Sequence, residues 1–235
     1  MNIILLTRTD CWRADDCVIL RDRRADHIRG VLRASVGDVL RVGLIDGLSG
    51  QAVVSALDSE AVTLRVALAD PPPKRHRFDI VLALPRPKML RRILRTVAEF
   101  GVSNLHLINT ARVDKSFWQT PLLEPPQVQE ALRAGMERSR DTIFPRVHQH
   151  RLFRPFVEDR LVEICAGRPC WIAQMGASQA LLDTPAGRAL VMIGPEGGFV
   201  PFELKLVQAV IAEPVNLGER LLSVDTALTS ALAQG

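Results

Sequence analysis

The sequence contains no tyrosine, and aromatic residues make up only 5% of its 235 positions. Domains that bind single-stranded RNA by stacking, such as RRM and OB domains, need several aromatic side chains on one surface. Phe117 and Trp118, which follow Arg112 and Lys115, are available to stack on a base, although core packing is the more frequent use of such residues. The composition therefore argues against a stacking platform.

Metal-binding and secretion patterns are also missing. The four cysteines, Cys11, Cys17, Cys165 and Cys170, form neither a CxxC pair nor a zinc ribbon, and no HExxH pair occurs. The sequence has no signal peptide and no apolar run long enough to cross a membrane. We therefore expect a reduced, cytoplasmic protein without a metal.

Two common nucleotide-binding loops are absent: the GxGxxG fingerprint, and the GxxxxGK loop that is followed by Ser or Thr. A different glycine loop, Gly194-Pro195-Glu196-Gly197-Gly198-Phe199, follows the apolar segment 189–193. Glycines at a strand end allow positive φ and let a ligand contact the main chain. The loop has no lysine for a phosphate and carries the carboxylate of Glu196, so it favours a cationic or neutral ligand. A plain turn before a helix that begins at Pro201 is the alternative.

A second segment favours the ligand-binding reading. It reads Leu217-Gly218-Glu219-Arg220-Leu221-Leu222 and continues into Ser223-Val224-Asp225-Thr226-Ala227-Leu228. Together the two segments resemble the paired cofactor loops of the SPOUT class of S-adenosylmethionine (SAM) methyltransferases. They are most similar to the RsmE-like branch, where the loops commonly read GPEGG and LGxRILRxETA. That branch methylates ring nitrogen 3 of a uridine in small-subunit (16S) ribosomal RNA.

The resemblance extends over nearly the whole chain. The family's HxxxVLR, GD and DG pattern is matched near the N-terminus, and its K…ELGV helix is matched in the middle. The matching residues are His27-Ile28-Arg29-Gly30-Val31-Leu32-Arg33, Val36-Gly37-Asp38, Asp46-Gly47, Lys88 and Glu99-Phe100-Gly101-Val102.

This resemblance implies an α/β fold with two domains. Residues 74–235 would form a SPOUT methyltransferase domain, with a mostly parallel sheet and a C-terminal trefoil knot. Residues 1–70 would form a small PUA-like RNA-binding β-barrel domain. The implied cofactor is SAM, the implied partner is ribosomal RNA or the small ribosomal subunit, and the implied assembly is a homodimer whose site uses both subunits.

The sequence also departs from the family pattern. Ser223 and Asp225 stand where the family commonly has Arg and Glu, and the central EQSxR element reads Glu137-Arg138-Ser139-Arg140-Asp141. These changes leave two alternatives open. One is a SPOUT paralogue that methylates another base or a ribose, and the other is a non-catalytic RNA-binding factor in ribosome assembly.

Local patterns support the two-domain reading. Pro71-Pro72-Pro73 can continue neither a strand nor a helix and predicts a connector. Before it, strands are predicted at 39–42, 51–57 and 61–68, with a helix at 24–33. After it, strands at 78–84, 105–108, 146–150, 170–173, 189–193 and Val215 alternate with helices at 88–100, 126–140, 153–166 and 223–234. Such alternation predicts a mostly parallel sheet. The strand at 78–84 leads into Pro85 with no glycine, which argues against an ordinary Rossmann fold.

The basic residues are unevenly distributed. Residues 1–70 hold nine Arg against ten acidic residues, whereas the remainder holds 21 of the 30 Lys and Arg against 16 acidic residues. Clustered positive charge predicts contacts with phosphate, although a solvated helix face is the alternative. The expected RNA contacts are Arg29, Arg33, Lys88, Arg91, Arg92, Arg112 and Arg140. With few aromatic residues, RNA would be recognised by shape and phosphate, with one base drawn into the site.

The resemblance also assigns site residues. The expected SAM contacts, chiefly through the main chain and leucine side chains, are Met175, Gly176, Ile193, Gly194, Pro195, Glu196, Gly197, Gly198, Leu217, Gly218, Leu221 and Leu222. A uracil nitrogen is a poor nucleophile until its proton leaves, so the reaction needs a base or a group that stabilises the anion. Arg220 is the first choice to stabilise the negative charge, and Glu196 and Asp225 are the other catalytic candidates.

Overall fold

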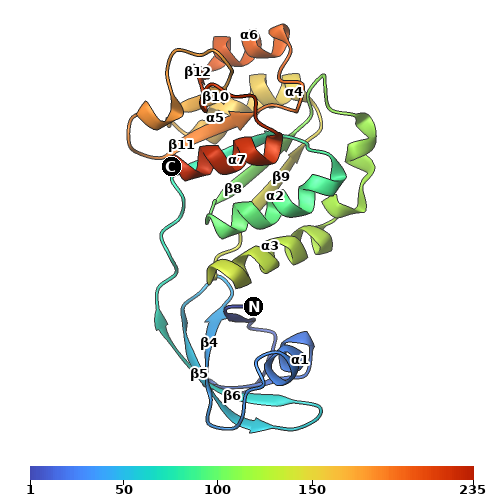
Figure 1. Cartoon of the computed structure of the whole chain (residues 1–235), viewed down its shortest axis with the longest axis vertical. Helices are drawn as coiled ribbons and strands as arrows, with labels where there is room; N and C mark the ends of the chain where they lie inside the picture. Colours follow the sequence, from blue (N-terminus) through green and yellow to red (C-terminus); the bar gives the residue numbers. More distant parts are fainter. The chain divides into compact units, whose positions relative to one another are not determined.

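The computed structural model describes all 235 residues, which divide into two compact units (Figure 1). The first unit comprises Met1–Lys74 and Met136–Phe144, and the second comprises Arg75–Gly135 and Pro145–Gly235. The first boundary lies between Lys74 and Arg75, one residue beyond the three prolines. The inclusion of Met136–Phe144 in the first unit was not predicted, because no pattern within this segment distinguishes it from the rest of its helix.

The first unit is built on a six-stranded sheet with the order β1-β4-β5-β6-β3-β2. β1 and β4 are parallel, and the other pairs are antiparallel. The two edge strands do not pair with each other, so the expected barrel is an open half-barrel. The strands are β1 (Ile4–Leu6), β2 (Cys11–Ala14), β3 (Cys17–Leu20), β4 (Val39–Leu44), β5 (Ser49–Leu57) and β6 (Val62–Asp70).

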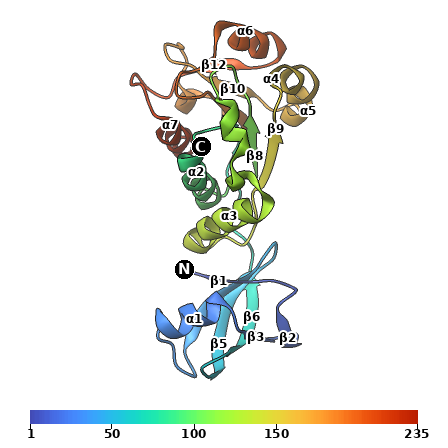
Figure 2. The same cartoon turned by 90° about the vertical axis from the view of Figure 1, so that its right-hand side faces the viewer.

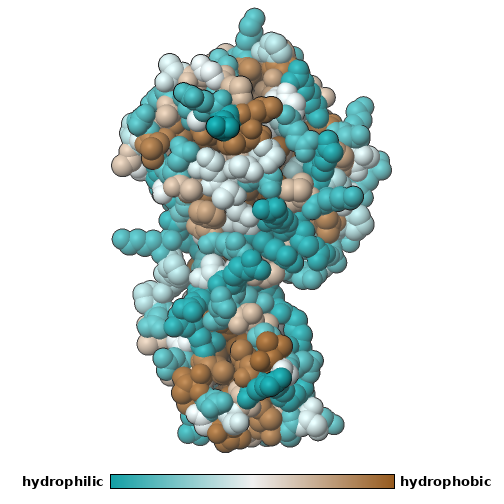
Figure 3. All heavy atoms as spheres, viewed as in Figure 1, coloured by the Kyte–Doolittle hydropathy of each residue, from teal (hydrophilic) through white to brown (hydrophobic).

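Helix α1 (Arg23–Gly30) covers the core of this unit. It begins where the side chain of Asp22 accepts a hydrogen bond from the backbone N–H of Arg24. It ends before the predicted limit at Arg33, which has a φ of 53° and so lies outside helical geometry. Hydrophobic side chains gather on the surface beside α1 (Figure 3); the exposed ones are Val31, Leu32, Val36, Val39 and Val53.

The second unit contains the predicted parallel sheet, and its strand order is β12-β10-β11-β7-β8-β9. All five strand pairs are parallel, which confirms the α/β class. Parallel strands bring all their carboxyl ends to one edge, where ligands of open α/β sheets commonly bind. The strands are β7 (Phe78–Ala83), β8 (Asn104–Ile108), β9 (Arg146–His150), β10 (Cys170–Ala173), β11 (Ala189–Ile193) and β12 (Glu213–Val215).

Helices cover both faces of this sheet, with α2 and α7 on one face and α4 and α5 on the other (Figure 2). None of the helices is long and apolar enough to span a membrane. The predicted helix at 153–166 is interrupted by a π-helical turn, η3 (Phe156–Arg160). The other helices are α2 (Pro87–Glu99), η1 (Lys115–Gln119), η2 (Pro121–Leu123), α3 (Pro125–Ser139), α4 (Phe153–Pro155), α5 (Leu161–Cys165), η4 (Leu181–Asp183), α6 (Pro201–Val210) and α7 (Val224–Ala233).

The ends of α2 follow from its sequence. Pro87 occupies the first turn, where a missing N–H costs nothing, and Gly101 adopts a φ of 69° just after the helix ends. Between them, Leu90, Ile93 and Leu94 are fully buried on one face. Leucine and isoleucine at this spacing bury an apolar stripe against the sheet.

The rings of three histidines on the neighbouring strands β8 and β9 stack on one another. His106 is only 5% exposed, and its ring lies 4.5 Å from that of His148 and 5.4 Å from that of His150. The Nδ1 atom of His106 and the Nε2 atom of His150 are 3.1 Å apart. Burial, helped by His148 and His150, lowers the pKa of His106 to about 3.

This low pKa predicts a loss of stability on mild acidification. The unfolded histidine binds a proton below about pH 6.5, whereas the folded one remains neutral, so the free energy of unfolding falls as pH decreases. Between pH 7 and pH 5 His106 should account for a loss of about 2 kcal/mol. We expect urea unfolding to show this loss in the wild type and a smaller loss in His106→Phe. An equal loss in both proteins would mean that His106 is not its source.

Candidate functional site

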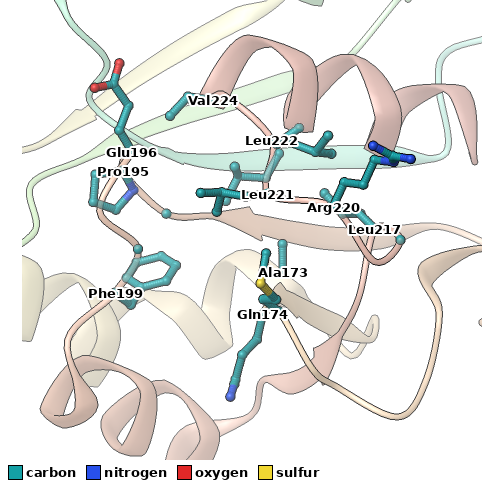
Figure 4. A pocket seen from close by; sticks show the side chains of 16 residues that line it. Ala173, Gln174, Pro195, Glu196, Phe199, Leu217, Arg220, Leu221, Leu222 and Val224 are labelled. Carbon is teal, nitrogen blue, oxygen red and sulfur yellow. The ribbon is translucent and has the colours of Figure 1, made fainter.

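The two glycine-containing loops line one cavity at the carboxyl edge of the parallel sheet. The loop after β11 and the loop before α7 face each other across a volume of about 160 Å³, and the loop after β10 completes the lining (Figure 4). Its residues are Ala173, Gln174, Met175, Ile193, Gly194, Pro195, Glu196, Gly198, Phe199, Leu217, Gly218, Arg220, Leu221, Leu222, Val224 and Ala227.

The first loop turns tightly after β11. The N–H of Gly198 donates to the carbonyl oxygen of Pro195 at 2.7 Å, and Gly198 has a φ of 73°, which glycine adopts without strain. A Cβ atom at Gly194 would lie 3.0 Å from the ring of Phe199. The glycines therefore allow the main chain to turn and the phenylalanine to pack closely on it.

The second loop is held by Asn216. Its side-chain amide donates to the carbonyl oxygens of Ala177 at 2.8 Å and Gln179 at 3.0 Å. The N–H of Gly218 donates back to the Asn216 side-chain oxygen at 3.1 Å, and Gly218 has a φ of 116°. One asparagine thus fixes the loop before α7 to the loop after β10.

Most predicted SAM contacts are brought together here. Ten of the twelve line the cavity, while Gly176 and Gly197 do not. Gly197 lines a neighbouring cavity instead, and Gly176 follows Met175 with a φ of 79°. Sequence reasoning missed Ala173, Gln174, Phe199, Val224 and Ala227. The spacing of the last two, one helical turn apart in α7, is the only signal that could have indicated them.

Two apolar side chains at this cavity are unusually exposed. Leu221 is 81% exposed and Met175 is 57% exposed. In a folded protein, large apolar side chains that surround a cavity in this way form a surface that a flat apolar ligand can cover. No cluster of three or more His, Cys, Asp or Glu residues is placed to hold a metal ion.

The three catalytic candidates do not converge on one point. Arg220 lines the cavity, and the carboxylate of Glu196 points away from Leu221 (Figure 4). Glu196 instead pairs with Arg86 at 2.8 Å. Asp225 does not line the cavity.

Asp225 is held by its neighbours. The Ser223 hydroxyl donates to its carboxylate at 2.6 Å, and Arg92 lies 3.5 Å away. The hydrogen bond from Ser223, with a smaller contribution from Arg92, lowers the pKa of Asp225. The serine that departs from the family pattern thus keeps this carboxylate ionised.

A second cavity of about 560 Å³ adjoins the first, and we call it the adjacent cavity. Pro195, Glu196 and Val224 line both of them. The remaining residues of its lining are Leu84, Pro85, Arg86, Arg112, Asp114, Phe117 and Gly197.

Glu203 connects the loops that build the adjacent cavity. Glu203 is only 3% exposed, and its carboxylate accepts two backbone hydrogen bonds, from the N–H of Val200 at 2.9 Å and from the N–H of Ala111 at 2.7 Å. Val200 follows the glycine loop, and Ala111 precedes Arg112. Glu203 also occupies the third position of α6, where a glutamate that bonds back to the helix start is favoured.

The predicted RNA contacts lie in several places. Lys88 is exposed at the start of α2, Arg91 approaches Glu130 at 3.9 Å, and Arg92 pairs with Asp225. Arg112 donates to the carbonyl oxygen of Gly197.

Within the first unit, Arg33 and Arg140 are exposed and both adopt positive φ. Arg29 pairs with Asp26 at 2.6 Å. This unit also has a cavity of about 480 Å³ that sequence reasoning missed. Arg8, Trp12 and Arg13 are among the residues that line it.

Comparison with known proteins identifies the family. A model of the RNA methyltransferase domain matches residues 72–234. The chain belongs to the RNA methyltransferase domain family. This RNA methyltransferase is 28% identical to ribosomal RNA small subunit methyltransferase E of Treponema pallidum, over 99% of its own length and 90% of that protein. Similar proteins include ribosomal RNA small subunit methyltransferase E of Synechocystis, which is 28% identical over 92% of this chain and 72% of the relative.

Solved structures share the fold. Ribosomal RNA small subunit methyltransferase E from Neisseria gonorrhoeae, bound to S-adenosyl methionine, superposes with a TM-score of 0.74 at 20% identity, over 98% of this chain and 96% of the other. A probable rRNA methyltransferase from Porphyromonas gingivalis gives a TM-score of 0.75 at 23% identity, over 100% of this chain and 95% of the other. These two structures therefore have the same fold as this chain.

The double contact of Glu203 predicts that its removal loosens both loops. Glu203→Ala leaves two N–H groups without an acceptor, which should cost about 1–2 kcal/mol of stability. We expect hydrogen exchange measured by mass spectrometry to become faster in segment 109–114 and in segment 195–203. The exposed Glu213 provides the control variant, Glu213→Ala, which should leave both segments protected. Faster exchange in α6 alone would show that Glu203 is only a helix cap.

Proposed function

We propose that this RNA methyltransferase uses SAM to methylate ring nitrogen 3 of a uridine in small-subunit ribosomal RNA. The observation that carries the proposal is that the glycine loop after β11 and the loop before α7, far apart in the sequence, line one cavity. Its relatives from Treponema and Synechocystis are named as small-subunit rRNA methyltransferases. The specific uridine nitrogen rests on the RsmE-like resemblance of these two loops.

The lining of the first cavity fits SAM. Leu217, Leu221 and Leu222 offer apolar surface for a purine, and Leu221 is otherwise 81% exposed. Beside Gly218 a Cβ atom would meet nothing within 4 Å, so a ligand can approach its main chain.

SAM supplies a methyl group on a sulfonium sulfur. In this proposal, the chain's own residues exclude water, position the reactants and stabilise charge. The leucines exclude water from the cavity, and the two loops fix the position from which the methyl group leaves. Arg220 lines the cavity with an exposed guanidinium, which is placed to stabilise an anion or to bind an RNA phosphate.

Several finer features belong to the same proposal. We propose that the segment after β10 and the loop before α7 take part in the trefoil knot. Asn216, at the start of that loop, forms several hydrogen bonds with segment 177–181. We also propose a PUA-like RNA-binding role for residues 1–70, a methyltransferase role for residues 74–235, a homodimer and a cytoplasmic location. The cavity beside Trp12, which includes two arginines, supports RNA binding by the first unit.

The proposal is tested by transfer of labelled methyl from SAM to naked small-subunit rRNA and to assembled subunits. Both substrates are prepared from cells that lack this protein, and nucleoside mass spectrometry identifies the product. We expect 3-methyluridine with the wild type. Leu221→Asp places a charge on the surface that would cover the purine, and it should weaken SAM binding about tenfold or more. The exposed Leu182 gives the control variant Leu182→Asp.

The outcomes separate the alternatives. Another methylated nucleoside would retain the cofactor and reject the uridine N3 target. No transfer to either substrate, with SAM bound, would favour the non-catalytic ribosome-assembly factor. Absence of SAM binding would reject the proposed cofactor.

A further inference from the structure

The adjacent cavity lies where an acceptor base would have to be. Pro195, Glu196 and Val224 line both this cavity and the proposed SAM cavity, so the two cavities adjoin at these residues. Transfer of a methyl group requires the nucleophile to approach within van der Waals contact of the methyl carbon. A base in the adjacent cavity could approach the methyl group where the two linings meet.

The polar groups of the cavity match one pyrimidine. The lining holds two arginines, Arg86 and Arg112, which can donate hydrogen bonds, and the carboxylate of Glu196, which can accept them. The edge of uracil presents a carbonyl oxygen, the N3–H donor and a second carbonyl oxygen. Cytosine presents an unprotonated N3, which would face the carboxylate with a lone pair. The lining therefore favours uracil over cytosine.

The ion pair between Arg86 and Glu196 can open at small cost. Arg86 and Glu196 are 66% and 48% exposed, and ion pairs so exposed contribute little to stability. The contact between them joins a guanidinium nitrogen of Arg86 to Oε2 of Glu196 at 2.8 Å. Arg112 lies across Gly197, where a Cβ atom would come within 2.9 Å of its Cδ atom. A residue with a side chain at position 197 would displace this arginine.

An aromatic ring completes the lining. Phe117 lies on η1, and its neighbour Trp118 anchors that helix by donating from Nε1 to the side chain of Asn109 at 3.0 Å. Asp114 caps η1 by accepting the N–H of Ser116 at 2.8 Å, and it does not line the proposed SAM cavity. Of the two carboxylates in the adjacent cavity, only that of Glu196 belongs to a residue that lines both cavities.

We infer that the adjacent cavity binds the uracil ring of the target nucleotide, and that Glu196 accepts the N3 proton. The inference rests on the proposed function. The N3–H bond breaks and its proton passes to the Glu196 carboxylate. N3 forms a bond to the methyl carbon of SAM while the carbon–sulfur bond breaks, and that electron pair stays on the sulfur as a neutral thioether. Arg86 and Arg112 bind the two carbonyl oxygens on which the negative charge of the deprotonated ring collects.

Glu196→Gln is the direct test, measured as single-turnover 3-methyluridine formation at saturating SAM. The amide keeps the size of the side chain and removes the base, so the rate at neutral pH should fall about 100-fold or more. Hydroxide must then remove the proton, so the variant's rate should rise about tenfold per pH unit, more steeply than the wild type. Glu219→Gln, in the neighbouring loop and outside both cavities, should match the wild type in rate and pH profile.

A second measurement does not depend on methyl transfer. An oligouridylate with one 4-thiouridine is irradiated in the presence of S-adenosylhomocysteine, and cross-linked peptides are mapped by mass spectrometry. We expect cross-links in segments 84–86 and 112–117, reduced about tenfold by Phe117→Ala and Arg112→Met. The exposed Arg188, outside both cavities, gives the control Arg188→Met. An oligocytidylate competitor should displace the probe less well than oligouridylate.

These results separate the inference from the function on which it rests. Wild-type 3-methyluridine formation with an unaffected Glu196→Gln variant, or with cross-links elsewhere, would overturn the inference and retain the function. Cross-links at the cavity without any methyl transfer would retain the binding site and overturn both the proposed activity and the role of Glu196 as a base. Equal competition by oligocytidylate would overturn the preference for uracil.

Discussion

The hydrogen bonds made by Glu203 are the constraint on which the site depends. One buried carboxylate binds the main chain at Val200 and at Ala111, so two loops that follow different strands keep a fixed separation. The first loop carries Glu196, and the second carries Arg112. A charged acceptor that binds two N–H groups is stronger than a neutral one, and burial strengthens both bonds further.

The parallel sheet explains why such loops meet at all. β7, β8, β10 and β11 all deliver their following segments to the same edge. Leu84 bonds to the carbonyl oxygen of Ile108 at 2.9 Å, which keeps the exits of β7 and β8 together. Residues distant in sequence, such as Arg86, Arg112 and Glu196, then line one cavity. The sheet brings the loops to one edge, and the loops carry the polar side chains that line the cavity.

The sequence predicted the elements with regular patterns and the cofactor loops with a recognisable motif. β9, β10 and β11 have the predicted bounds, and ten of the twelve proposed SAM contacts share a cavity. It did not predict β1 to β3, which are short and lack a clear alternation. It also missed the role of Glu203, because a glutamate in the first turn of a helix is common for local reasons, and only the fold brings Ala111 within reach. Long-range polar contacts of this kind leave no local pattern.

The formal charges differ between the adjacent cavity and its surroundings. Two arginines and two carboxylates line the adjacent cavity, so their formal charges cancel, which suits an uncharged base better than a phosphate. Unpaired positive charge lies outside it, with Lys88 exposed at the start of α2. Phosphate contacts give affinity without reading sequence, whereas contacts with a base edge discriminate. In the proposed reaction, basic residues outside the cavity would hold the RNA backbone, and the neutral cavity would admit a single base. Once Glu196 takes the proton of that base, its carboxylate no longer balances the two arginines, whose positive charge then stabilises the deprotonated ring.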